Sequence, residues 1–345
     1  MKKLLTLCLM AFTTSALADY IFVVPQKPGG GTSQWAQIVA TQLEPFLGEN
    51  ITIKHIPGAR DIPGFNKFHN SLRTSNKIIM VSNGGNGVSF LQEKVDYDYR
   101  DYDSIGLMNL NIIAAKRIGE NMDYPKFSAG SGKVPEAWAM ALLICGPGLT
   151  MNEYLACFKE HVTWVNGMSN SERRLAFKRG ELNGTRENPA AYKKHVETDE
   201  NAEIWFHHGI LQADGSHADD PNHPGFQLEI LFEERWDVEP SGEFYDAYKL
   251  VKSFRDGMQK ALWVNKGNPN TFLLRNALHQ MSLDPDAIAA IEKKVGKYEW
   301  KIGDEGNAQV DTLMSFITPE ALINLIHFNK EALGLASVYK EKLIE

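Results

Sequence analysis

The sequence has 345 residues and a formal net charge of −7, with 43% hydrophobic and 10% aromatic residues. A chain of this length is long enough for two domains that each bury a core. Its negative charge argues against a nucleic acid as partner. The three cysteines form neither a CxxC pair nor a zinc-ligand spacing with histidine, so we expect no metal site and no cofactor.

The first 18 residues are typical of a signal peptide. Lys2 and Lys3 precede an apolar run at residues 4–12, and a small-residue cleavage site ends at Ala18. The alternative is a first buried helix. No later apolar run approaches the ~20 residues that a membrane-spanning helix needs. We therefore expect an exported, periplasmic protein that is cleaved after Ala18.

The first part of the mature chain alternates between strand-like and helix-like segments. Thr32 or Ser33 can cap a helix whose apolar residues recur at helical spacing until Gly48 ends it. Short β-rich runs lie at 20–24, 51–53 and 78–81, and a further helix is expected at 66–72. This alternation predicts a mainly parallel sheet flanked by helices.

The remaining elements indicate a second lobe inserted into the first. An apolar extended run covers 104–115, a helix begins near Pro135, and the tail from Asn270 is largely helical. We also expect strands at 162–165, 203–206 and 261–264 and a solvated helix at 170–179. Crossings near 110–115 and 261–266 would give a first lobe of 19–112 and 265–345, and a second of 113–264.

Three loops of small residues follow predicted strands. The first contains Gly29, Gly30 and Gly31, and the others cover 82–87 and 127–133. A strand, a glycine-rich loop and a helix suit an anion, because glycine lets a ligand approach unpaired N–H groups. A tight turn without ligand is the alternative. Neither GxxxxGK[ST] nor GxGxxG is present, which disfavours a nucleotide. Loops at the ends of parallel strands gather at one edge, so all three could face one cleft.

The order of several short motifs resembles the substrate-binding proteins of tripartite tricarboxylate transporters, the TctC/Bug family. No single motif is specific, and the resemblance rests on their order along most of the mature chain. The matching segments are VVPQKPGGGTS at 23–33, IPGA at 56–59, IMVSNG at 79–84, YDSIGL at 102–107, FSAGSG at 127–132 and VTWVNG at 162–167.

The resemblance implies a two-lobed periplasmic binding protein of type II. Such a protein, expected to be a monomer and not an enzyme, would close on a small carboxylate and deliver it to integral membrane subunits of a symporter. Ser33 and Asn183 stand where the family commonly has aspartate, a helix is missing between 118 and 127, and 145–157 looks like an insertion. These departures mark a divergent member.

Cations near the matched loops indicate the charge of the ligand. Lys27, Arg60, Lys133 and Arg186 could contact an anion, and the alternatives are solvated side chains or salt bridges to neighbouring acids. Together they favour an anion, and a dianion in particular, over an amino acid. The complete expected ligand site consists of Lys27, Gly29, Gly30, Gly31, Thr32, Ser33, Arg60, Ser82, Asn83, Gly130, Ser131, Gly132, Lys133, Asn183 and Arg186.

Two cysteines, Cys145 and Cys157, remain after the expected cleavage. The alternatives for them are a disulfide, which export permits, and two separately buried thiols.

Other functions have weaker support. The loop at 207–223 holds four histidines, but their spacing fits no familiar metal site, so a solvated loop is expected. A secreted hydrolase would need a nucleophile such as Ser82 or Ser131, and neither lies in GxSxG. A sensory or adaptor protein that presents its ligand to a membrane receptor would have the same fold and cleft as a transport protein.

Overall fold

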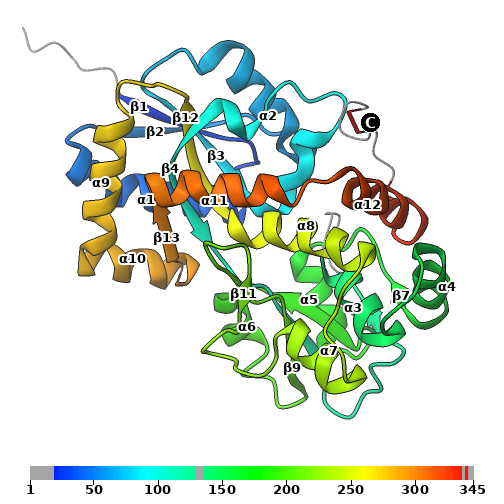
Figure 1. Cartoon of the computed structure of the whole chain (residues 1–345). Helices are drawn as coiled ribbons and strands as arrows, with labels where there is room; N and C mark the ends of the chain where they lie inside the picture. Colours follow the sequence, from blue (N-terminus) through cyan, green and yellow to red (C-terminus); the bar gives the residue numbers. More distant parts are fainter. Residues whose placement is uncertain (1–18, 129–134, 298, 336–338, 341–345) are drawn as a thin grey trace, which may run out of the picture.

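Two large β-sheets surrounded by helices, together with a two-stranded hairpin, make up the described part of the protein (Figure 1). The computed structural model describes residues 19–128, 135–297, 299–335 and 339–340, so the expected signal peptide at 1–18 lies outside the described residues. The architecture confirms the predicted α/β fold with two sheets flanked by helices. None of the described helices is both long enough and apolar enough to span a membrane.

The larger sheet combines strands from both ends of the chain. They are β1 (Tyr20–Val24), β2 (Ile51–His55), β3 (Ile78–Asn83), β4 (Tyr102–Asn109), β12 (Lys260–Asn265) and β13 (Glu299–Ile302). Their order is β13-β4-β12-β3-β1-β2. β1 is parallel to β2 and β3, whereas β12 is antiparallel to β3 and β4, and β13 is antiparallel to β4.

The smaller sheet comes from the middle of the chain. Its strands are β5 (Ile113–Arg117), β6 (Lys126–Phe127), β7 (Thr163–Trp164), β8 (Gly184–Glu187) and β9 (Ala202–His207), in the order β7-β6-β8-β5-β9. β6 is parallel to β7 and β8, and β5 is antiparallel to β8 and β9. Both sheets are therefore mixed, with more antiparallel pairing than the sequence predicts.

Twelve helices pack around these sheets in the described part of the chain. They are α1 (Gly31–Leu47), α2 (Ile62–Lys67), α3 (Pro135–Cys145), α4 (Met151–His161), α5 (Asn170–Lys178), α6 (Pro189–His195), α7 (Leu228–Trp236), α8 (Glu243–Gly257), α9 (Thr271–Leu283), α10 (Pro285–Val295), α11 (Asp304–Ser315) and α12 (Pro319–Glu331). Shorter helical turns are η1 (Ala59–Asp61), η2 (Phe68–Leu72), η3 (Gly84–Leu91) and η4 (Tyr99–Asp101).

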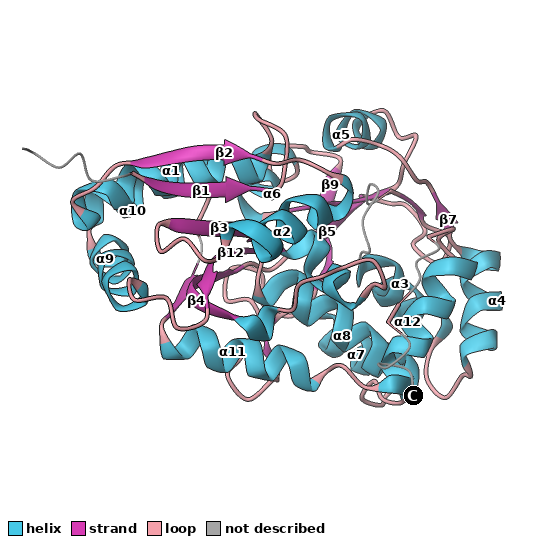
Figure 2. Ribbon diagram, turned by 90° about the horizontal axis from the view of Figure 1, so that it is seen from above, coloured by secondary structure: helices cyan, strands magenta, loops and turns pink. Residues whose placement is uncertain are grey.

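The glycine loop between β1 and α1 takes a different form from the one predicted. Gly30 occupies the N-cap position of α1, and Thr32 and Ser33 lie buried in its first turn, so neither caps the helix as expected. Gly29 has φ 82°, a left-handed conformation that glycine adopts without strain. Gly48 ends the helix in the left-handed region, as predicted. Helices α1 and α9 pack against the larger sheet, and α10 packs on these two helices (Figure 2).

The chain passes between the two sheets at 110–112. The predicted extended run at 104–115 is divided there, because β4 belongs to the larger sheet and β5 to the smaller one. The chain returns to the larger sheet where α8 ends and β12 begins. The turn segment at 118–125 contains no helix, in agreement with the sequence. The predicted loop at 207–225 includes a hairpin of β10 (Ile210–Leu211) and β11 (His217–Ala218).

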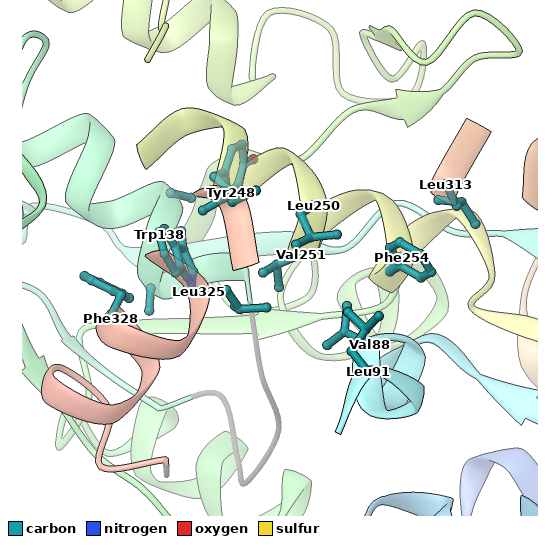
Figure 3. Close-up of a cluster of buried hydrophobic side chains, with 14 of the residues drawn as sticks. Val88, Leu91, Trp138, Tyr248, Leu250, Val251, Phe254, Leu313, Leu325 and Phe328 are labelled. Atoms are coloured by element: carbon teal, nitrogen blue, oxygen red, sulfur yellow. The ribbon is translucent and has the colours of Figure 1, made fainter. Parts of the chain in front are cut away.

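The C-terminal helix α12 packs against helices from the middle of the chain (Figures 1 and 3). Trp138 of α3 lies between Phe244 of α8 and Phe328 of α12, with ring centroids 4.6 and 4.4 Å away. Leu322 and Leu325 of α12 are also fully buried in this cluster. One continuous apolar core therefore joins segments that the sequence divides between two lobes.

Cys145 at the end of α3 and Cys157 in α4 form a disulfide, which decides between the two alternatives left open by the sequence. The bridge lies in the segment that looks like an insertion, and it ties α4 to the buried helix α3.

Replacing both cysteines with alanine is expected to lower the free energy of unfolding by about 2–4 kcal/mol, because the unfolded chain gains the entropy of an open loop. Urea unfolding of the double variant Cys145→Ala/Cys157→Ala against the oxidised protein measures this loss. The intact protein treated with a reductant is the control and should approach the variant. Equal midpoints for oxidised protein and variant would contradict the prediction.

Candidate anion-binding site

A cavity of about 250 Å³ lies between elements of the two sheets. Its lining comes from the β1–α1 loop, the connection after β4, helix α5, the end of β8, and the junction of α8 and β12. The lining residues are Gln26, Gly31, Thr32, Leu110, Ile112, Asn170, Arg173, Arg174, Arg186, Glu187, Asn188, Arg255, Gln259 and Lys260.

The first wall of this cavity is the start of α1. Gly31 and Thr32 line it, and no side chain caps the helix at Gly30. The first N–H groups of a helix have no partner within the helix, and its dipole makes this end positive. The glycine loop therefore offers backbone donors and a favourable potential to an anion.

The second wall is formed where α8 ends and β12 begins. Arg255 and Lys260 line the cavity and are buried. Burial and the nearby charge of Arg255 lower the pKa of Lys260 to about 7, although Asp61 opposes this shift. Burial in turn raises the pKa of Asp61 to about 6. An anion in the cavity would supply a negative charge that favours the charged form of Lys260.

The third wall comes from the smaller sheet and α5. Arg174 makes a bidentate salt bridge with the buried Glu187, with Nε–Oε1 2.8 Å and Nη2–Oε2 2.7 Å. Arg173 is 2% exposed and donates to Thr185 Oγ1 at 3.1 Å and to the Arg186 carbonyl at 2.7 Å. Arg186 Nε lies 3.2 Å from an oxygen of Glu136. These contacts fix three guanidinium groups on one side of the cavity.

The charge of the lining favours an anionic ligand. Three arginines from the third wall join Arg255 and Lys260, whereas Glu187 is the one carboxylate among the described lining residues. Charge interactions are stronger among buried groups than in bulk water, because the effective dielectric constant is lower.

A second cavity, of about 690 Å³, lies on the other side of the connection at Leu110. Its lining has five acids, Glu197, Asp220, Asp256, Glu292 and Glu299, and two lysines, Lys193 and Lys297. This composition suits an anion less well than the smaller cavity does.

The residues expected from the first glycine loop are partly brought to the smaller cavity. Gly31 and Thr32 line it, while Lys27, Gly29 and Gly30 are exposed in the same loop. Ser33 is fully buried, and its Oγ lies 3.4 Å from His55 Nε2. This contact with β2 differs from the exposed ligand contact that the family pattern suggested.

Residues expected from the neighbouring loops pack beside strands of the larger sheet and do not appear among the described lining residues. Arg60 donates from Nη1 to Gln92 Oε1 at 3.0 Å. Ser82 Oγ accepts a hydrogen bond from Trp263 Nε1 at 2.8 Å, and Asn83 bonds to Asp61. Glycine is required at position 84 by packing, because a Cβ on Gly84 would lie 1.9 Å from the Arg255 carbonyl oxygen.

The expected residues of the second lobe have mixed outcomes. Arg186 lines the cavity, as expected. Asn183 is not among the described lining residues. Its Oδ1 accepts a hydrogen bond from the Lys126 N–H at 2.6 Å, which connects the start of β8 to β6. Gly130, Ser131, Gly132 and Lys133 lie outside the described residues.

Sequence reasoning missed Arg173, Arg174, Arg255 and Lys260. The polar helix at 170–179 was interpreted as solvated, and no helix was predicted around Arg255. Two signals could have found them. Adjacent arginines in the first turns of a helix place positive charge at its positive end, which needs a compensating acid or ligand. Lys260 begins the apolar strand KALWVN, where a cation is costly without a partner.

The histidine-rich segment at 207–223 is not the solvated loop that the sequence predicts, because His207 and His208 are fully buried and form internal contacts. His207 Nε2 lies 3.1 Å from Asp219, and His208 Nδ1 lies 2.8 Å from the Tyr248 hydroxyl. Burial lowers the pKa of both histidines. Within the described ranges, no group of three or more His, Cys, Asp or Glu residues is placed to hold a metal ion.

Comparison with solved structures places this architecture among two-lobed periplasmic binding proteins, and several of the similar structures are TctC or Bug proteins. A TctC solute-binding protein from Polaromonas superposes with a TM-score of 0.57 at 14% identity, covering 89% of this chain and 98% of that one. The periplasmic binding protein BugD gives 0.52 at 13% identity, covering 91% and 97%. An R. palustris protein solved with adipate gives 0.54 at 12% identity, covering 92% and 98%.

No protein-family model and no curated protein sequence matches the chain. At these identities the solved structures establish the fold. The chain therefore has the fold of these binding proteins at 12–14% sequence identity.

Proposed function

We propose that the protein is a divergent solute-binding protein of the TctC/Bug type that captures a small carboxylate or similar organic anion in the 250 Å³ cavity. The observation that carries this proposal is the cationic lining, with Arg174, Arg186, Arg255 and Lys260 arranged beside the uncapped start of α1. The R. palustris protein of the same fold was solved with adipate, a carboxylate. The protein acts as a binder and not as an enzyme.

We also propose a location and membrane partners for the protein. The protein is exported by the signal peptide at 1–18, works in the periplasm as a monomer, and delivers its ligand to the membrane subunits of a tripartite symporter. The two lobes consist of 19–112 with 265–345 and of 113–264. They hinge about the connection at 110–112 and the α8–β12 junction, while α12 keeps them in contact. A ligand that touches both lobes stabilises the closed form.

A thermal-shift screen tests the proposed function. Monocarboxylates, dicarboxylates, tricarboxylates, sulfonates and amino acids are added at equal ionic strength, with sodium chloride as the control. A bound ligand raises the melting temperature by mass action, so at least one organic acid should raise it well above the salt control. A response to amino acids alone, or to none of these compounds, would contradict the proposal.

Affinity for the anion is expected to fall as the pH rises above about 7. A bound anion favours the charged form of Lys260 and so raises the pKa of this lysine above about 7. Above about pH 7 the unliganded lysine is mostly neutral, so binding must take up a proton and the affinity falls as the pH rises. An anion would also raise the pKa of Asp61, because nearby negative charge favours its neutral form, and this acts in the same direction.

Calorimetric titration at pH 6, 7 and 8 measures this dependence, which can reach about tenfold per pH unit when one proton is taken up. Lys260→Met is the control variant and should show a flatter profile. A variant and a parent protein with the same pH dependence would rule out Lys260 as the titrating group.

A further inference from the structure

Arg174 is held in a fixed position on the cavity wall. Both oxygens of Glu187 accept hydrogen bonds from its Nε and Nη2, and Glu187 is only 3% exposed. A bidentate pair restricts the plane of the guanidinium as well as its place. The Arg174 side chain retains 27% exposure and lines the cavity, so part of this oriented group remains accessible to a ligand.

Arg173 contacts the same carboxylate as its neighbour, with Nη2 3.4 Å from Glu187 Oε1, but most of its hydrogen bonds go to other groups. Its three nitrogens donate to Thr185 Oγ1, Asn170 Oδ1 and the Arg186 carbonyl, at 3.1, 3.1 and 2.7 Å. These bonds connect the first turn of α5 to β8, the strand that carries Glu187. Arg173 is therefore a positioning residue, and Arg174 is the cation that its contacts and Glu187 present to the cavity.

Positive charge also approaches the cavity from the opposite lobe. Lys260 begins β12 of the larger sheet, and Gly31 and Thr32 supply the N-terminal turn of α1. A ligand with one anionic end can neutralise one of these walls. The other wall then keeps its positive charge, and like charges oppose the approach of the lobes.

Resting on the proposed function, we propose that the ligand carries an anionic group at each of two ends. Lys260 and the start of α1 bind one end, and Arg174 oriented by Glu187 binds the other. Arg174 is thus the residue that makes the protein distinguish a dianion from a monoanion of the same length.

Matched pairs of ligands test this assignment. Succinate is compared with butyrate, and adipate with hexanoate, because each pair has the same chain length and differs by one carboxylate. The parent protein should bind at least one dicarboxylate on the order of 10–100-fold more tightly than its monocarboxylate partner, since a charge-assisted bidentate contact is lost in the latter.

Arg174→Gln should remove most of this preference, because it weakens binding of the dicarboxylate much more than binding of the monocarboxylate. Arg174→Lys keeps the charge without the fork and should retain part of the preference. Arg179→Gln is the matched control, because Arg179 follows the same helix, is exposed and pairs with Glu181. Circular dichroism shows whether each variant is folded. If Arg174→Gln does not fold, Arg174→Lys is used for the test instead.

Two results would overturn the assignment. One is a parent protein that binds the dicarboxylate and its monocarboxylate partner equally well, and the other is an Arg174→Gln variant that keeps the full preference. Both differ from failure of the proposed function, in which the parent protein binds no carboxylate of either kind.

Discussion

Replacing Trp138 with alanine is expected to lower the free energy of unfolding by about 3–5 kcal/mol. The indole is fully buried in α3 and contacts rings from α8 and α12, so its loss leaves a cavity where three helices meet. The surrounding helices are tied together by a disulfide and a continuous core, which limits their collapse into that space. Figure 3 shows Trp138 beside Leu325 and Phe328.

Urea unfolding of Trp138→Ala measures this effect, with Phe272→Ala as the control. Phe272 is 83% exposed, so its truncation should change the free energy of unfolding by no more than about 0.5 kcal/mol. Similar values for the two variants would contradict the packing of α12 on α3 and α8.

Replacing Arg173 with alanine should lower the free energy of unfolding by about 3–5 kcal/mol, because Arg173 forms a buried ion pair with Glu187 and its removal leaves buried polar groups without a partner. The substitution removes the donor that bonds to the Arg186 carbonyl and to Thr185 Oγ1. Glu187 then has Arg174 as its remaining arginine partner. The same change should weaken anion binding, since it frees β8 from α5. Burial and the nearby Arg186 lower the pKa of Arg173 to about 10, so the group stays charged at neutral pH.

Chemical unfolding and ligand titration of the same variant separate the two effects. Arg179→Ala is the control, because its salt bridge with Glu181 is exposed and contributes little. Arg173→Lys should recover part of the stability but lose the contacts that need a planar group. A stable Arg173→Ala protein with unchanged affinity would show that this arginine neither braces β8 nor supports the site.

Local sequence patterns predicted much of the larger sheet and its helices. The runs at 20–24 and 78–81 are apolar and bounded by glycine or proline, so neighbouring residues alone specify strands there. Gly48 ended α1 where a left-handed residue was required. The N-cap of α1 was harder, because Gly30, Thr32 and Ser33 can each begin a helix and packing against β2 decided among them.

The binding site depended on contacts that the sequence does not display. The helix at 170–179 has the polar composition of a surface helix, yet Arg173 is buried because β8 packs beside it. Asn83 and Arg60 lie in loops that resemble ligand loops, but they satisfy Asp61 and Gln92. Lys260 is placed in the cavity by a strand that returns 150 residues after β4, and local patterns contain no information on that pairing.

A crystal structure of the protein with the tightest-binding acid from the screen tests the central claim most directly. We expect the ligand in the 250 Å³ cavity, with one anionic end near Lys260 and the first turn of α1 and the other near Arg174. A ligand in the acid-lined 690 Å³ cavity, or on the surface with the cationic cavity empty, would contradict it.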